Sequence, residues 1–130
     1  MSISNLLYAA KEARNKAYAP YSRFKVGCAL LCANGQVYTG CNIENASYSA
    51  TLCAERVAFA QAVSKGQKDF VAIAIVGGNT PCPPCGVCAQ FISEFVEPNT
   101  FNVIMLENDA PKVVKFAKIL PLAFGKDNIK

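Results

Sequence analysis

Three stretches of the chain carry apolar residues at helical spacing. Between residues 3 and 18 the apolar side chains recur every three or four positions, with charged and amide side chains on the opposite face. This pattern predicts an amphipathic helix that ends at Pro20. An alanine-rich stretch predicts a second helix from residue 53 to about residue 64, and a third is expected between residues 84 and 97.

Other stretches alternate between apolar and polar residues, or are continuously apolar, as strands are. From Phe24 to Leu30 every second residue is apolar, and Asn34-Gly35 predicts a hairpin turn into residues 36 to 41. Residues 70 to 76 are a continuous apolar run, which is typical of a strand buried on both faces. Residues 102 to 106 predict a further strand.

The order of these elements predicts the fold class. A hairpin followed by helix, strand, helix and strand indicates an α/β layered fold with a mixed sheet. No repeat or linker interrupts the chain, so residues 1–130 are expected to form a single domain. The stretch from Ile119 to Gly125 is apolar for a terminal segment, so we expect it to dock on another surface.

Composition narrows the class of protein. Of the 130 residues, 52% are hydrophobic and 17% are charged, which suggests that extra surface is buried between subunits. No apolar run approaches the ~20 residues of a membrane span, and the first residues do not form a signal peptide. We therefore expect a cytoplasmic protein, where seven cysteines indicate metal or redox chemistry before disulfides.

The charged residues argue against a nucleic-acid partner. The formal net charge is only +4, and the thirteen basic residues are scattered rather than gathered on one face. Histidine is absent, which excludes catalytic systems that depend on a histidine base and any imidazole ligand to a metal.

Two short motifs carry the candidate chemistry. Cys53 stands at the predicted start of one helix, for which Thr51 is a plausible cap, and Cys85 and Cys88 open the next. Thiolates at helix starts gain from the backbone dipole. Three thiolate ligands would hold a tetrahedral zinc ion and leave a fourth position for water, as in catalytic zinc sites. By contrast, Cys28 and Cys32 lie on the apolar face of a strand and are expected to be small core residues.

Two charged residues next to Cys53 suit such a site. Zinc with three thiolates has a net charge of about −1, and Arg56 is placed to offset it. Glu55 could then carry protons between water and a substrate, which needs a carboxylate beside the metal and not bound to it.

These motifs resemble those of the short, homotetrameric, zinc-dependent cytidine deaminases. The resemblance rests on Cys53-Ala54-Glu55-Arg56, Pro84-Cys85-Gly86-Val87-Cys88-Ala89-Gln90, Tyr21-Ser22-x-Phe24-x-Val26-Gly27, Asn42-Ile43-Glu44-Asn45-Ala46-x-Tyr48 and Leu120-Pro121-x-Ala123-Phe124. It implies a three-layer α/β/α sandwich around a mixed sheet of about five strands, and the deamination of free cytidine and deoxycytidine in pyrimidine salvage.

The same resemblance implies roles for individual residues. Cys53, Cys85 and Cys88 would bind one zinc ion per chain, and Glu55 would activate water and protonate N3 and the leaving amine. Asn42 and Glu44 would hold the ribose hydroxyls, while Phe124 would reach the active site of a neighbouring subunit. The implied nucleoside-binding residues are Phe24, Asn42, Glu44, Tyr48, Ala54 and Phe124.

Two departures from the family pattern leave alternatives open. Ala89 stands where family members usually have arginine. Cys82 adds a second C-x-x-C pair, so Cys53, Cys82, Cys85 and Cys88 could form a closed Cys₄ site in a binding module without catalysis. A third reading keeps the fold and changes the substrate to another aminated heterocycle or to RNA, although scattered charge gives little support for binding a polynucleotide.

Overall fold

The computed structural model describes residues 1–129. The elements follow in the order α1 (Ile3–Arg14), β1 (Gly27–Cys32), β2 (Val37–Cys41), α2 (Ala54–Ser64), β3 (Phe70–Val76), α3 (Gly86–Ser93), β4 (Asn102–Glu107), β5 (Ala110–Lys115) and α4 (Phe116–Ile119), with short 3₁₀ turns at Tyr48–Ala50 and Lys126–Ile129. Within this part of the chain, none of the helices has the length and apolar character needed to cross a membrane.

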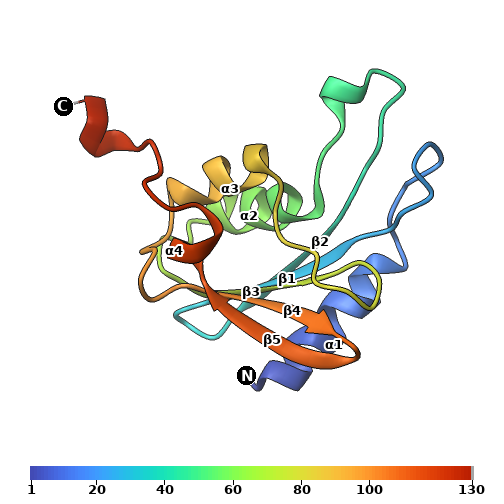
Figure 1. Ribbon diagram of the computed structural model, residues 1–130, viewed down its shortest axis with the longest axis horizontal. Coiled ribbons are helices and arrows are strands. Elements are labelled where there is room, and N and C mark those ends of the chain that lie inside the picture. The colour runs from blue at the N-terminus through green and yellow to red at the C-terminus, as the bar shows by residue number, and fades with distance from the viewer. Residues whose placement is uncertain (130) are drawn as a thin grey trace.

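The strands form one five-stranded sheet in the order β2-β1-β3-β4-β5. β3 and β4 are parallel, and every other neighbouring pair is antiparallel, so the sheet is mixed. Helix α1 covers one face, and α2 and α3 lie side by side on the other (Figure 1). The three-layer α/β/α sandwich expected from the sequence is thereby confirmed.

Each face of the sheet has its own apolar core. On the α1 side, Leu6, Leu7 and Ala10 pack against small and branched residues of the central strands. On the other side, Phe59 and Ile92 of the two helices pack against the opposite face of the same strands. Cys28 and Cys32 belong to this second core and are almost completely buried, as predicted. A two-sided core explains why β3 is continuously apolar.

Two glycines let helices approach the sheet at backbone distance. A Cβ atom at Gly27 would lie 2.0 Å from the carbonyl oxygen of Ala10 in α1. One at Gly40 would lie 2.5 Å from the carbonyl oxygen of Ala54, at the start of α2. Any side chain at Gly40 would therefore push the first turn of α2 away from the sheet.

The first helix is shorter than the sequence pattern predicts. It ends at Arg14, four residues before the end of the apolar stripe. The reason is a competing partner, because the Tyr18 N–H donates to the Asn42 carbonyl and the Tyr18 carbonyl accepts from the Glu44 N–H. Tyr18 thus pairs with the loop after β2 in an isolated bridge, and the chain leaves the helix to reach it.

The alternation of apolar and polar residues in the sequence does not predict the fifth strand, β5. β5 is an exposed edge strand containing Pro111 and lysines, which are common on protected sheet edges and hide the alternation of a strand. Asn108 and Asp109 form the turn before it, and both have positive φ angles, 53° and 65°.

Candidate functional site

The three thiols singled out from the sequence come together at the start of two helices. Cys53 is the N-cap of α2, Cys85 is the N-cap of α3, and Cys88 lies in the first turn of α3. Their sulfur atoms all lie within 4.8 Å of one another. Neither N-cap side chain bonds the helix backbone, so both thiols are available to a ligand.

Strand directions explain why two helix starts meet. β2 and β3 are both antiparallel to β1 and therefore run in the same direction. α2 follows the carboxyl end of β2 after a loop, and α3 follows that of β3. Both helices thus begin at the same edge of the sheet, where ligand sites of α/β proteins commonly lie.

The electrostatics of the cluster favour a thiolate. A hydrogen bond from the Cys88 thiol and the neighbouring Arg56 guanidinium lower the pKa of Cys53 to about 5 despite its partial burial. The same hydrogen bond has the opposite effect on Cys88. The Cys88 thiol is the donor and keeps the proton, so the pKa of Cys88 is raised. A low-pKa thiolate beside two further soft sulfurs is a donor set that fits zinc.

The spacing of the sulfurs also fits a tetrahedral ion. Zn–S bonds of ~2.3 Å in tetrahedral geometry place sulfur atoms about 3.8 Å apart. The observed upper limit of 4.8 Å requires only small side-chain movements to reach that arrangement. Cys82 does not belong to this group among the described residues, so the geometry does not support the closed Cys₄ site.

Arg56 lies against the cluster, as expected from its position. Its Nη2 donates to the Thr51 carbonyl at 2.8 Å, and its buried Nε has no hydrogen-bond partner in the part of the chain that the structure describes. Burial opposes the charged guanidinium, but its interactions with Cys53 and Cys88 prevail and raise the Arg56 pKa. The arginine is a fixed positive charge beside the thiols.

Thr51 has a different role from the one predicted. The cap of α2 is Cys53, and the Thr51 hydroxyl instead accepts the backbone N–H of Asn45 at 3.1 Å. Thr51 therefore tightens the loop before α2 and orients Arg56 through its carbonyl group.

Glu55 is a buried carboxyl group beside the thiol cluster and is not a member of it. It lies in the first turn of α2, and only 5% of its surface is exposed. Burial raises its pKa to about 7, so at neutral pH it exchanges protons readily. Its Oε1 accepts a hydrogen bond from the Cys28 thiol at 3.8 Å, a contact that the sequence does not indicate.

Asn42 and Glu44 connect two loops at the same edge of the sheet. The Asn42 amide accepts from the Val26 N–H and donates to the Phe24 carbonyl, both at 2.9 Å. Glu44 accepts the backbone N–H groups of Tyr21 and Ser22 at 3.0 and 3.1 Å, and also the Ser22 hydroxyl.

The Ser22 hydroxyl holds the Glu44 pKa below its usual value, so this side chain is ionised at neutral pH. Each of the two side chains keeps unused hydrogen-bonding capacity, Asn42 as donor and acceptor and Glu44 as acceptor.

Aromatic rings stand around these polar groups. The half-exposed Phe24 ring lies over Gly77, where a Cβ atom would be 2.6 Å from its Cζ and 3.3 Å from the Cys82 sulfur. Tyr48 is exposed and lies 6.0 Å from Tyr21 between ring centroids. A cavity of about 300 Å³ lies between the two loops and is lined by Tyr21, Ser22, Glu44, Tyr48 and Thr51. Ala54 is buried at the start of α2, next to Cys53.

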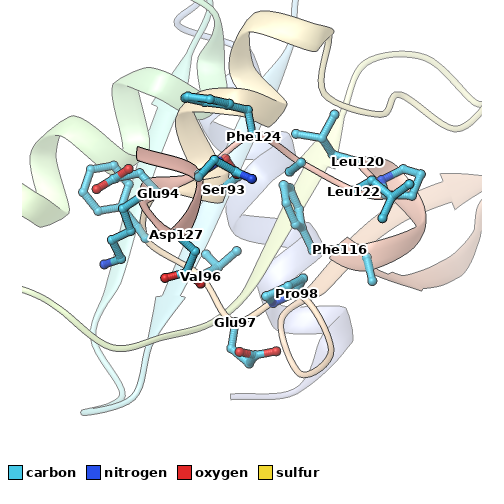
Figure 2. Close-up of a pocket in the computed structure, with 17 residues that line it drawn as sticks. Ser93, Glu94, Val96, Glu97, Pro98, Phe116, Leu120, Leu122, Phe124 and Asp127 are labelled. Carbon is cyan, nitrogen blue, oxygen red and sulfur yellow. The ribbon is translucent and has the colours of Figure 1, made fainter. Parts of the chain in front are cut away.

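Phe124 is not brought to the thiols within its own chain. It lies on the wall of a separate cavity of about 680 Å³ between the end of α3, α4 and the terminal segment, which none of the three cysteines lines (Figure 2). Its carbonyl accepts from Gln90 of α3 at 2.8 Å, while 61% of the residue is exposed. Within the chain itself, Ile119 and Leu120 of this segment pack against the core, while Leu122 is fully exposed.

Comparison with known proteins matches this chain to cytidine deaminases by both sequence and structure. The family model for the cytidine and deoxycytidylate deaminase zinc-binding region matches residues 1–105. A cytidine deaminase from Sporosarcina psychrophila is 45% identical over 131 residues, covering 99% of this chain and 96% of the relative. A crystal structure of cytidine deaminase from Burkholderia pseudomallei superposes with a TM-score of 0.88 at 46% identity, covering 95% of this chain and all of that one. A blasticidin-S deaminase from Bacillus cereus is more distant, at 29% identity over 82% of this chain and 81% of the relative.

Proposed function

Because the chain belongs to the cytidine and deoxycytidylate deaminase family, we propose that it is a hydrolase that converts free cytidine and deoxycytidine to uridine and deoxyuridine with release of ammonia. The observation that carries this proposal is the buried Glu55 carboxyl group beside three thiols within 4.8 Å of one another. The likeness to a blasticidin-S deaminase is more distant, 29% against 45% identity, which supports cytidine as the substrate. Incubation with cytidine should give uridine and ammonia in equal amounts.

We propose that Cys53, Cys85 and Cys88 hold one zinc ion and leave a fourth position open. Zinc bound there supplies a Lewis acid that activates a water molecule at neutral pH. The cluster must remain reduced for this role, and we propose a cytoplasmic location, where thiols are kept reduced.

Glu55 is proposed as the proton carrier. Its carboxylate accepts one proton of the attacking water and passes it to N3 of the ring. It then takes the second proton from the hydroxyl group on C4, as the C4 carbonyl forms, and delivers it to the amine that leaves C4. A single group can serve in both directions because its pKa of about 7 lies close to the working pH. Its burial keeps bulk water from competing for these protons.

Arg56 is proposed to stabilise the ionised thiols. In an Arg56→Gln variant the positive charge that lowers the Cys53 pKa is lost, so that pKa rises. Zinc binding requires deprotonated thiols, and zinc should therefore be released at a higher pH than from the parent as the solution is acidified. Zinc transfer to a chromogenic chelator, followed from neutral pH downward, gives the pH at which half of the zinc is released. If the parent and the variant released half of their zinc at the same pH, Arg56 would not have this role.

The nucleoside is proposed to bind between the two loops that Asn42 and Glu44 connect. The unused amide and carboxylate groups match the donors and acceptors of a ribose diol. Phe24 and Tyr48 offer apolar faces to the sugar and ring, and Ala54 adds a small, close wall beside Cys53.

This arrangement predicts discrimination against phosphorylated substrates. Glu44 is ionised, and a 5′-phosphate near the ribose would meet its negative charge. We expect kcat/KM for cytidine 5′-monophosphate to be at least about tenfold lower than for cytidine. Initial rates of uracil formation on both compounds at equal salt test this, and equal rates would show that Glu44 does not face the ribose.

We propose that the working form is a homotetramer in which Phe124 completes the site of a neighbouring subunit. The support is the exposure of Leu122 and Phe124 in a chain that is 52% hydrophobic. Sedimentation should give four times the chain mass of 13.9 kDa.

Phe124→Ala and Glu55→Gln variants should each have low activity, and mixed tetramers should regain part of it, because some sites combine an intact Glu55 with an intact Phe124. Phe124→Ala is preferable to truncation, since Leu120 packs against the core. A fully active monomer would contradict the proposal.

A further inference from the structure

Cys28 is a buried thiol directly beneath the start of α2. It lies on the central part of the sheet, in β1, with none of its surface exposed. Its cross-strand partner in β2 is Gly40, the glycine that allows Ala54 of α2 to approach the sheet at backbone distance. The first turn of α2, which carries Glu55, is thus seated against the β1–β2 pair where Cys28 points toward the helix layer.

The Cys28 thiol donates to Glu55 and to no other described group. Its sulfur lies 3.8 Å from Oε1 of Glu55. Complete burial and the nearby Glu55 charge raise the Cys28 pKa well above its usual value, so the thiol keeps its proton and acts only as a donor. Among the described residues it is the one side chain that hydrogen-bonds this carboxylate, and Oε2 receives no side-chain donor.

We propose that Cys28 is a positioning residue for Glu55: its thiol fixes Oε1 on the sheet side and leaves Oε2 to exchange protons with water and substrate. This role rests on the proposed function, because it matters only if Glu55 carries protons. A carboxylate with one oxygen fixed loses less rotational freedom in the reaction, since its orientation is set before the substrate binds.

Cys32 provides a matched control on the same strand face. It is equally buried, belongs to the same core as Cys28, and makes no hydrogen bond to Glu55. Burial alone raises its pKa. A role in packing is thus shared by both cysteines, whereas the contact with Glu55 belongs to Cys28 alone.

The test compares Cys28→Ala, Cys28→Ser and Cys32→Ala with the parent, each measured for zinc content, melting temperature, kcat and KM on cytidine. Cys28→Ala should keep its zinc and KM and lose about 3- to 10-fold in kcat, the size expected for one net hydrogen bond. Cys28→Ser, which retains a donor, should recover most of this loss. Cys32→Ala should melt at a lower temperature and keep the parent kcat. Cys28→Val also lacks a donor and replaces Cys28→Ala in the comparison if the alanine variant does not fold.

The outcomes separate this role from the proposed function. An active parent with unchanged kcat in the variants without a donor would overturn the positioning role alone, and so would a serine variant as slow as the alanine variant. A parent that does not deaminate cytidine would overturn the proposed function, and the role of Cys28 with it.

Discussion

A Glu55→Gln variant is expected to keep one zinc ion per chain and to lose about 10²- to 10⁴-fold in kcat. Glutamine has nearly the same shape as glutamate and can still receive the Cys28 hydrogen bond at its amide oxygen, so the first turn of α2 should be preserved. It cannot accept and return protons, however, and the same carboxyl group serves several steps. Steady-state kinetics on cytidine, together with zinc analysis of the same preparation, measure both quantities.

Two controls make this result specific. The thermal stability of Glu55→Gln should equal or exceed that of the parent, because a buried carboxyl group with a raised pKa opposes folding when it is ionised. Loss of zinc from this variant would mean that Glu55 binds the metal, and retention of normal turnover would mean that another group transfers the protons.

Cys85→Ser is expected to lose both zinc and all measurable activity. The serine hydroxyl is not ionised at neutral pH and is a poor zinc ligand, so only two thiolates would remain. Cys82→Ser is the matched control, because Cys82 lies three residues earlier in the same loop and outside the group of three sulfurs. Cys82→Ser should retain one zinc per chain and most of the activity.

Zinc content by elemental analysis distinguishes the two possible ligand sets. Zinc loss from Cys82→Ser would restore the closed Cys₄ arrangement. Normal zinc content in Cys85→Ser would remove Cys85 from the ligand set and leave the cluster without an explanation.

Much of the site could be predicted because its residues are unusual for their positions. A thiol, a carboxylate and a guanidinium in residues 53 to 56 at a helix start do not fit a packing role, and in the structure the Cys53 thiol interacts with both charged groups. Buried strands were equally clear, because β3 is apolar on both faces. The layered α/β fold with a mixed sheet followed from the order of these elements, and the three-layer sandwich from the family resemblance.

What the sequence could not reveal depends on contacts between distant segments. The end of α1 is set by the pairing of Tyr18 with the loop after β2, and no local propensity encodes that pairing. The hydrogen bond between Cys28 and Glu55 depends on the register of β1 and β2 and on the seating of α2 against Gly40. A buried cysteine that only packs and one that also donates a hydrogen bond have the same sequence signal.

The most direct test of the account is zinc titration of the metal-free protein, with deamination of cytidine followed in the same samples. Uridine and ammonia should appear together, and the rate should rise in proportion to added zinc until one ion is bound per chain. Full activity without zinc, a plateau at another stoichiometry, or zinc binding at this ratio without ammonia release would contradict it.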